Sequence, residues 1–391
     1  MDAAPKLSFI VLSYNYADLI GQTIRSILDQ TVRDFEIVVV DDASRDSSRA
    51  VVAAFGDPRI RLLVNERNLG GAGSYNRAVA AARGEWLVNL DADDWIAPDK
   101  CEKQLAYLRD NKVAVLGTYT SYVDRQGRPH PNQAVLDPLV NRPFDLNAIE
   151  NWVAMNRMVR SSSMVSRAAH LAVGLDDAAM VRAPDYELWT RFLRHGYRFA
   201  VLPEKLTFYR LHGSGVTHAD PIGSLLEMSY AKLRNLMPLI ESRAAWPLML
   251  QILNWWIHQE AFARLRPIER YRLLGMLVLP PEWTDYAAFH SLVTAETGRD
   301  ATVCAGQRVL VASPFGRASV GPLASANDAM LVAAGQRLLV ISQYAAPDLD
   351  ARRARLRRWL ARTARATLGR ERAARIRHMI RCWLCGEQSV F

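Results

Sequence analysis

The stretch WLVNLDADD, residues 86–94, places a strand-like apolar run directly before three aspartates. Carboxylates spaced by one residue at a strand end can hold a hard divalent cation and still leave room for phosphate oxygens and water. Asp91, Asp93 and Asp94 are therefore candidate metal ligands. The alternative is an ordinary aspartate cluster, in which Asp94 caps the segment around Trp95 and a helix begins near Pro98. The segments that precede this stretch favour the metal-binding interpretation.

Three more strand-like segments lie upstream, with helix-like segments between them. Strands are expected at residues 9–12, 35–40, 60–64 and 86–90, and helices at 20–28, 51–55 and 75–82. Strands and helices that alternate at this spacing indicate parallel strands joined by crossover helices. We therefore predict an α/β fold with a Rossmann-like, mostly parallel sheet flanked by helices. Ligands of such sheets bind beyond the carboxyl ends of the strands.

Polar residues follow each of these predicted strands. They are Ser13, Tyr14 and Asn15 after the first, Asp41 and Asp42 after the second, and residues 65–68 after the third. Parallel register would bring them to one edge of the sheet, beside the aspartates that follow the fourth. A carboxylate at Asp41 or Asp42 can accept from a uracil N–H or a ribose hydroxyl, or from Ser44 in an Asx turn. Tyr14 can stack on a base or pack under its own loop.

Residues 68–76, NLGGAGSYN, partly match a dinucleotide-binding fingerprint. Asn76 stands where the third glycine belongs, and the segment follows the third predicted strand instead of the first, so NAD is not the expected ligand. We interpret the glycines, Gly70 among them, as a loop that passes close to a nucleotide. The pattern GxxxxGK[ST] is absent, which argues against a P-loop NTPase.

The composition indicates a folded protein with one unusual segment. Half of the 391 residues are hydrophobic, which excludes wholesale disorder, and four cysteines do not make a disulfide scaffold. The first residues do not read as a secretory signal, and no apolar window is long enough to span a membrane, so we expect a cytoplasmic protein. The net charge of +9 comes from residues 351–391, where twelve arginines face two glutamates.

That basic tail, residues 351–391, carries apolar residues at helical spacing and arginines on its other faces. It reads as one amphipathic helix or two. Two interpretations stay open: the tail lies on an anionic membrane surface, or it packs on the rest of the chain or on a partner. Nucleic acid is not expected as a partner, because aromatic residues are sparse there.

Five segments, in order, resemble the motifs of GT-A-fold inverting glycosyltransferases of family 2. They are SFIVLSYN from residue 8, SILDQTVRDFEIVVVDDAS from residue 26, the stretch 68–76, ARGEWLVNLDADD from residue 82, and APDYELWTRFLRHGYRFAVLPEKLTFYRLHGSGVTH from residue 183. The last of these also predicts a helix at 185–193 and strands at 199–202 and 206–209. The resemblance covers about residues 6–220. It implies a GT-A fold, a divalent metal (Mn²⁺ or Mg²⁺) and a nucleotide-sugar donor, usually a UDP-sugar.

The resemblance also implies roles for individual residues. Tyr14, Asp42 and Asn68 would surround the nucleoside, while Asp93 would be the principal metal ligand, with Asp91 and Asp94 supporting the metal or the sugar. Further residues expected to contact the nucleotide sugar are Ser13, Asn15, Asp41, Gly70 and Asn76. One departure is Leu12, where many members have proline.

The family's general base lies in a Glu-Asp pair ahead of a helix. Here the pair reads Pro184-Asp185, so the glutamate is missing and Asp185 remains the candidate base. The segment YRLH, residues 209–212, matches a position where some members bring a histidine to the metal, which makes His212 a further candidate ligand.

We therefore expect an enzyme that transfers a sugar, with inversion, from a nucleotide diphosphate to a hydroxyl of a glycan or glycolipid in bacterial surface polysaccharide synthesis. The expected parts are a catalytic domain at 1–220, a helical extension at 221–300, a small unassigned unit at 301–350 with strands near 308–314 and 336–343, and the basic tail. Two alternatives stay open. The missing glutamate supports a non-catalytic sugar-nucleotide-binding or docking scaffold. A nucleotidyltransferase would share the aspartates, but it needs more basic residues than Arg67 and Arg77 to bind a triphosphate.

Overall fold

The computed structural model describes residues 4–211, 221–239, 285–297, 308–313, 316–322, 330–334 and 337–341. The chain divides into two compact units, Met1–Leu239 and Ile240–Phe391, each described here by itself. His212 and the basic tail lie outside the described residues, as does most of the expected helical extension.

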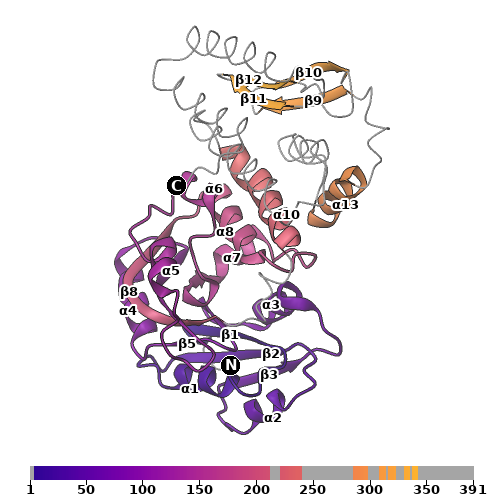
Figure 1. The fold of residues 1–391 in the computed structure, drawn as a ribbon. Helices are drawn as coiled ribbons and strands as arrows, with labels where there is room; N and C mark the ends of the chain where they lie inside the picture. Colours follow the sequence, from indigo (N-terminus) through magenta and orange to yellow (C-terminus); the bar gives the residue numbers. More distant parts are fainter. Residues whose placement is uncertain are drawn as a thin grey trace. The chain divides into compact units, whose positions relative to one another are not determined.

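One eight-stranded sheet, in the order β3-β2-β1-β4-β7-β6-β8-β5, forms the centre of the first unit (Figure 1). Its strands are β1 (Leu7–Ser13), β2 (Phe35–Asp41), β3 (Ile60–Val64), β4 (Trp86–Asp91), β5 (Trp95–Ile96), β6 (Val115–Val123), β7 (Met164–Ser166) and β8 (Phe199–Arg210). The first four strands of that order run parallel, and β6 pairs with β8 in parallel. Antiparallel β7 joins the two parallel sets, and β5 pairs antiparallel with β8. The predicted GT-A-like α/β fold class is confirmed.

Helices cover both faces of this sheet. They are α1 (Ile20–Leu28), α2 (Ser48–Ala53), α3 (Gly70–Ala81), α4 (Lys100–Asp110), α5 (Gln133–Val140), α6 (Glu150–Ala154), α7 (Arg167–Val173), α8 (Pro184–Arg194) and α10 (Pro221–Ala231), with short helical turns η1 (Arg160–Ser162), η2 (Lys232–Leu236) and η3 (Met237–Leu239). In Figure 1, α1 and α2 lie on one face of β1–β3, and α3, α7 and α8 lie on the other. Among the described residues, no helix is long and apolar enough to cross a membrane.

The core explains why the parallel strands are continuously apolar. β2 is buried along its whole length, because helices cover both of its faces. On one face, Phe9 and Val11 pack with Ile20, Ile24 and Ile27 of α1 in a hydrophobic core cluster. The isoleucines recur at the helical spacing predicted for this segment, and all three are fully buried.

The second unit contains α13 (Tyr286–Thr297) and two two-stranded antiparallel sheets. Their strands are β9 (Arg308–Ser313), β10 (Gly316–Pro322), β11 (Met330–Ala334) and β12 (Arg337–Ile341). The strands predicted near 308–314 and 336–343 are therefore present as β9 and β12. β10 and β11, which the sequence did not predict, are their partners.

Candidate active site

Backbone and side-chain hydrogen bonds join the loops that follow β1 and β2. The Asp42 N–H donates to the Ser13 carbonyl at 2.8 Å, and Asn15 adopts a left-handed backbone with φ of 59°. Asn15 donates its N–H to Ser44 Oγ at 2.9 Å, while its side-chain oxygen accepts the Arg45 N–H at 2.8 Å. Asparagine tolerates this conformation better than most residues. Tyr14, beside it, is 43% exposed.

Asp41 and Asp42 both bind backbone amides. Asp41 Oδ1 accepts the Ser44 N–H at 2.9 Å, which is the Asx turn considered from the sequence. The Asp42 carboxylate accepts the Leu69 N–H at 2.7 Å, the Gly70 N–H at 2.9 Å and the Asn65 amide at 2.7 Å. Asp42 therefore fixes the start of α3, where unpaired N–H groups favour a negative charge.

Asn68 and Gly70 meet at the same helix start. Asn68 Oδ1 accepts the Gly70 N–H at 3.0 Å, and its amide donates to the Asp42 carbonyl at 3.4 Å. Gly70 has a φ of 74°, a conformation that side-chain-bearing residues rarely adopt. The structure therefore brings Asp42, Asn68 and Gly70 together, as the parallel-sheet argument predicted.

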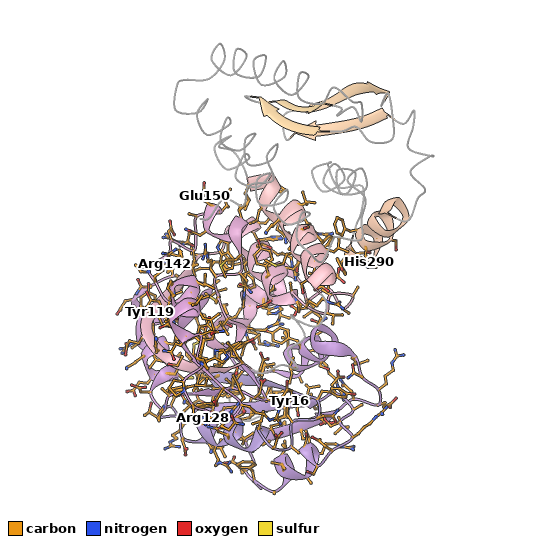
Figure 2. All side chains as sticks on the ribbon, viewed as in Figure 1. Tyr16, Tyr119, Arg128, Arg142, Glu150 and His290 are labelled. Atoms are coloured by element: carbon orange, nitrogen blue, oxygen red, sulfur yellow. The ribbon has the colours of Figure 1, made fainter. Side chains whose placement is uncertain are left out.

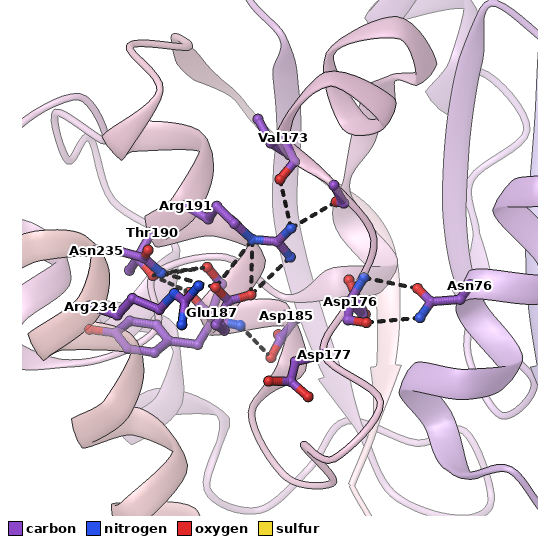
Figure 3. A network of polar contacts seen from close by, with 12 residues as sticks. Asn76, Val173, Asp176, Asp177, Asp185, Glu187, Thr190, Arg191, Arg234 and Asn235 are labelled. Carbon is purple, nitrogen blue, oxygen red and sulfur yellow. Dashed lines mark hydrogen bonds and ion pairs between the residues drawn. The ribbon is translucent and has the colours of Figure 1, made fainter. Parts of the chain in front are cut away.

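Asn76 is engaged elsewhere. Its amide donates to the Asp176 carbonyl at 2.8 Å, and its side-chain oxygen accepts the Asp176 N–H at 2.9 Å (Figure 3). This reciprocal pair ties α3 to the loop between α7 and α8. Both polar ends of the Asn76 side chain are therefore used within the protein, and its expected contact with the nucleotide sugar stays a prediction.

The acidic turn, residues 91–94, follows β4. The Asp94 N–H donates to the Asp91 carbonyl at 3.0 Å, and Thr23 of α1 donates its hydroxyl to the carbonyls of Ala92 and Asp94, both at 2.8 Å. Ser161 accepts the Asp91 N–H at 3.1 Å. The turn is thus held from α1 on one side and from η1 on the other.

Three carboxylates lie close together in the acidic turn. Burial and the neighbouring Asp93 raise the pKa of Asp91 to about 6 and hold the pKa of Asp94 well above its ordinary value. Asp94 Oδ1 accepts the Arg210 N–H at 2.8 Å, but Asp94 Oδ2 is buried with no hydrogen-bond partner among the described residues. A divalent cation would stabilise the charged carboxylates and give the unpartnered Asp94 Oδ2 a ligand, so the residues present fit such a cation. Within the described ranges, however, no three His, Cys, Asp or Glu side chains form a complete cluster of metal ligands.

Arg210 and Tyr16 support this turn, and neither was singled out from the sequence. Arg210 donates Nε to the Asp93 carbonyl and Nη2 to Gln22 Oε1, both at 2.8 Å, and its guanidinium lies 4.9 Å from the centre of the Trp95 ring. Tyr16, labelled in Figure 2, is hydrogen-bonded to Asp93, and burial together with the three aspartates raises the pKa of its hydroxyl. Arg210 falls within the segment YRLH, so that motif was the signal for it.

Asp185 lies in the first turn of α8 and carries two hydrogen bonds. Its Oδ1 accepts the Tyr186 N–H and its Oδ2 accepts the Asn156 amide, each at 2.8 Å. Burial raises the pKa of Asp185, while the Arg160 guanidinium opposes that shift. The Asp185 charge in turn raises the pKa of Asp91, so the candidate base and the acidic turn are within electrostatic reach of each other.

Arg160 is a positive charge among these acids. Its Nη2 lies 2.7 Å from Asp176 Oδ2, and its guanidinium lies 3.7 Å from the centre of the Tyr75 ring. Burial disfavours its charged form, but the attraction of Asp176, Tyr75 and Asp185 outweighs this and raises the pKa of Arg160. The sequence offers no signal for Arg160, which is a single arginine ahead of three serines.

Two buried glutamates, one in α8 and one in α10, connect α8 and the segment before it to neighbouring parts of the chain. Glu187 forms an ion pair with Arg191 at 2.9 Å and accepts from the Asn235 amide at 3.1 Å, and Arg191 donates to the carbonyls of Val173 and Gly174 (Figure 3). Glu227 of α10 is fully buried. Its carboxylate accepts the consecutive N–H groups of residues 181–183 at 2.9, 2.7 and 2.7 Å. These contacts fix the backbone immediately before Asp185.

Comparisons with known proteins agree with this architecture. The family model for glycosyl transferase family 2 matches residues 8–172. An uncharacterized glycosyltransferase of Haemophilus influenzae is 30% identical over 222 residues, which cover 55% of this chain and 68% of that protein. The putative teichuronic acid biosynthesis glycosyltransferase TuaG of Bacillus subtilis is 29% identical over 224 residues, 54% of this chain and 82% of that protein.

A third relative has a more specific name. WfgD of Escherichia coli, a UDP-Glc:alpha-D-GlcNAc-diphosphoundecaprenol beta-1,3-glucosyltransferase, is 41% identical over 115 residues, which cover 29% of this chain and 45% of that protein. The family match, the length and identity of the Haemophilus alignment, and the α/β fold lead to one conclusion: this chain belongs to glycosyltransferase family 2.

Proposed function

We propose that the chain is an inverting, divalent-metal-dependent transferase that moves a sugar from a UDP-sugar to a hydroxyl of a glycan or glycolipid. The observation that carries this proposal is the acidic turn at the end of β4, where Asp94 Oδ2 is buried without a hydrogen-bond partner among the described residues. A donor held at the turn would present its anomeric carbon to an acceptor whose hydroxyl faces Asp185. Inversion requires the donor site and the base to lie on opposite sides of the anomeric carbon, because the acceptor attacks from the face opposite the departing diphosphate.

The chain's own residues divide into three groups. Asp93, with support from Asp91, Asp94 and His212, would hold Mn²⁺ or Mg²⁺, which when bound neutralises charge that develops on the diphosphate. Tyr14 and Asn68 would contact the nucleoside. Asp42 fixes the start of α3 beside them. Asp185 would accept the proton of the acceptor hydroxyl as the new glycosidic bond forms.

The names of two relatives support the donor and acceptor classes. WfgD is named for a UDP-glucose donor and a diphosphoundecaprenol-linked acceptor, and TuaG for teichuronic acid biosynthesis. A lipid-linked acceptor would place the enzyme at the inner face of the cytoplasmic membrane. The arginine-rich tail could provide contact with anionic lipids there, in line with its sequence.

The decisive experiment measures nucleotide release and sugar transfer by the full chain, with a panel of nucleotide sugars, lipid-linked acceptors and either Mn²⁺ or Mg²⁺. Asp93→Asn is expected to abolish metal-dependent turnover. Asp185→Asn is expected to keep UDP binding and lose about 10²–10⁴-fold in kcat. Asp99→Asn is the matched control, because Asp99 lies close to the turn in sequence but pairs with Lys103 at a half-exposed site. Full activity of Asp93→Asn would refute the proposal.

A further inference from the structure

Asn156, in the loop between α6 and η1, donates a side-chain hydrogen bond to the candidate base. Its Nδ2 donates to Asp185 Oδ2 at 2.8 Å, and its Oδ1 accepts the Met158 N–H at 3.2 Å. A backbone N–H can only donate, so the oxygen of the Asn156 amide must face Met158. The amide nitrogen must then face Asp185, which fixes the direction of this hydrogen bond.

The same segment also binds Tyr186, the residue that follows the candidate base. The Tyr186 hydroxyl donates to the Trp152 carbonyl of α6, and both of these aromatic side chains are fully buried. Asp185 Oδ1 is held by the Tyr186 N–H. One carboxylate oxygen is thus positioned by α8 itself and the other by Asn156. Each oxygen keeps a second lone pair, because a carboxylate offers about four acceptor positions.

Asp185 lies among charged groups, whereas the Asn156 amide that donates to it is neutral. Arg160 of η1 attracts the carboxylate, while Asp176 of the α7–α8 loop and Asp91 of β4 repel it. The phenol of Tyr209 on β8 is a fourth titratable neighbour. Arg160 is shared with Asp176 at 2.7 Å, so it does not serve Asp185 alone. The Asn156 amide therefore adds a donor aimed at the charged form of Asp185, without adding another charge.

We propose that Asn156 is a positioning residue for Asp185: its amide fixes Oδ2 of the carboxylate and favours the ionised form that can accept a proton. The inference rests on the proposed role of Asp185 as general base. It follows from the rule that a hydrogen bond donated to a charged group stabilises that charge. It also resembles the wider pattern in which a catalytic base is oriented by a third group.

The sharpest test is Asn156→Asp in the full chain, with kcat and KM measured across pH. Aspartate can still accept the Met158 N–H, but it cannot donate to Asp185 and it places a second carboxylate beside it. The acidic limb of the kcat profile is expected to move up by about one pH unit or more, and kcat at neutral pH to fall by about tenfold or more. KM for the donor is expected to stay within about threefold, because the nucleotide is proposed to bind at the strand ends.

Two further variants keep the test decisive if Asn156→Asp folds poorly. Asn156→Ala removes the donor without adding a charge, so a smaller shift in the same direction is expected. The double variant Asn156→Asp with Asp185→Asn exchanges the two side chains and can restore the hydrogen bond. It should recover the stability lost in Asn156→Asp but remain inactive. Asn151→Asp is the matched control, because the Asn151 side chain is partly exposed and donates to the Asp145 carbonyl instead of to a carboxylate.

The outcomes separate this inference from the proposal beneath it. If Asp185→Asn is inactive while Asn156→Asp and Asn156→Ala keep the wild-type pH profile, Asn156 does not position the base. The inference also fails if the Asn156 variants lose stability alone, with the acidic limb unmoved. Wild-type activity of Asp185→Asn would instead remove Asp185 as the base, and the proposed mechanism with it.

Discussion

The candidate active site lies between two regions that are built by different means. Residues 7–96 form the side proposed to bind the nucleotide through the register of parallel strands, which places Ser13 beside Asp41 and Leu12 beside Asp91. Residues 150–239 supply the candidate base from the first turn of a helix. That turn is held by side chains that come from distant parts of the sequence.

Glu36 of the first region and Glu227 of the second are both buried, and they differ in what they bind. Glu36 on β2 accepts from Ser8 Oγ at 2.7 Å, the Arg83 N–H at 2.6 Å and Arg61 Nη1 at 2.9 Å. Ser8, Glu36 and Arg61 lie on strands already joined by backbone hydrogen bonds. Glu227 instead binds three backbone amides that have no strand ladder around them. Glu36 therefore reinforces strands that are already paired, whereas Glu227 organises a segment that lies outside the sheet.

Glu227→Ala tests this difference between the two glutamates, and it is expected to reduce stability more than any other variant proposed for the two regions. The substitution leaves three N–H groups without their acceptor beneath a buried helix start, so we expect the free energy of unfolding to fall by about 3–5 kcal/mol. Glu36→Ala is expected to cost less, because Arg61 and Arg83 are 37% and 55% exposed and water can replace the carboxylate. Denaturant unfolding measures both values, and equal losses would break the comparison.

A pH-dependent prediction concerns His170, which is fully buried in α7 of the second region. Neither of its ring nitrogens has a hydrogen-bond partner among the described residues, and burial lowers the pKa of His170 to about 4. The unfolded imidazole takes up a proton below about pH 6.5, whereas the folded one does so only near 4. The unfolded state therefore binds more protons in this interval, and stability falls as the pH drops.

His170→Phe should remove this sensitivity, since the ring already packs between Tyr75 and Phe192 at 5.5 and 6.2 Å between ring centres. Between pH 7 and pH 4, the wild type should lose up to about 3 kcal/mol more stability than the variant. Comparing the two proteins cancels the titration of the other buried acids. If their stabilities change in parallel with pH, His170 is not buried as a neutral group.

The strands of the first region could be predicted because each is a short apolar run that ends in polar residues. The start of α3 could not: the helix was expected from Tyr75, but it begins at Gly70. Glycines favour loops, yet here the Asp42 carboxylate binds the amides of Leu69 and Gly70 and stabilises the earlier start. A contact across 27 residues thus outweighs the local preference.

The second region was harder to predict for the same reason. The two strands expected at 199–202 and 206–209 are one strand, β8, whose register with β6 shifts between Thr118 and Thr120. The shifted register skips Pro203, and proline has no N–H to donate to a strand ladder. Asn156 and Glu227 act across 29 and 44 residues, and neither belongs to a periodic pattern. Asp185 was identified only through its resemblance to a family motif.

Asp42→Asn tests a carboxylate of the first region that binds backbone amides. Replacing one carboxylate oxygen by an NH₂ group sets a donor against the N–H of Leu69 or Gly70, so the helix start loses part of its cap. We expect a loss of about 1–2 kcal/mol in the free energy of unfolding. Weaker UDP binding should accompany it, because Asn68 bonds to the same loop. Calorimetry with UDP and Mn²⁺ measures the second effect, and unchanged stability would remove Asp42 as the cap.

The smallest effect is expected at a surface ion pair between α4, which lies outside both regions, and β8 of the second region. Lys103 of α4 pairs with Asp99 at 2.8 Å and with Glu204 of β8 at 2.5 Å, and all three side chains are between 37% and 49% exposed. Water and salt compete for such charges, so Glu204→Gln should shift the melting temperature by less than about 1 °C. Thermal unfolding at low and high salt measures this. A larger, salt-sensitive loss would mean that surface ion pairs help to hold β8, in which case buried carboxylates would not be the main organisers of the second region.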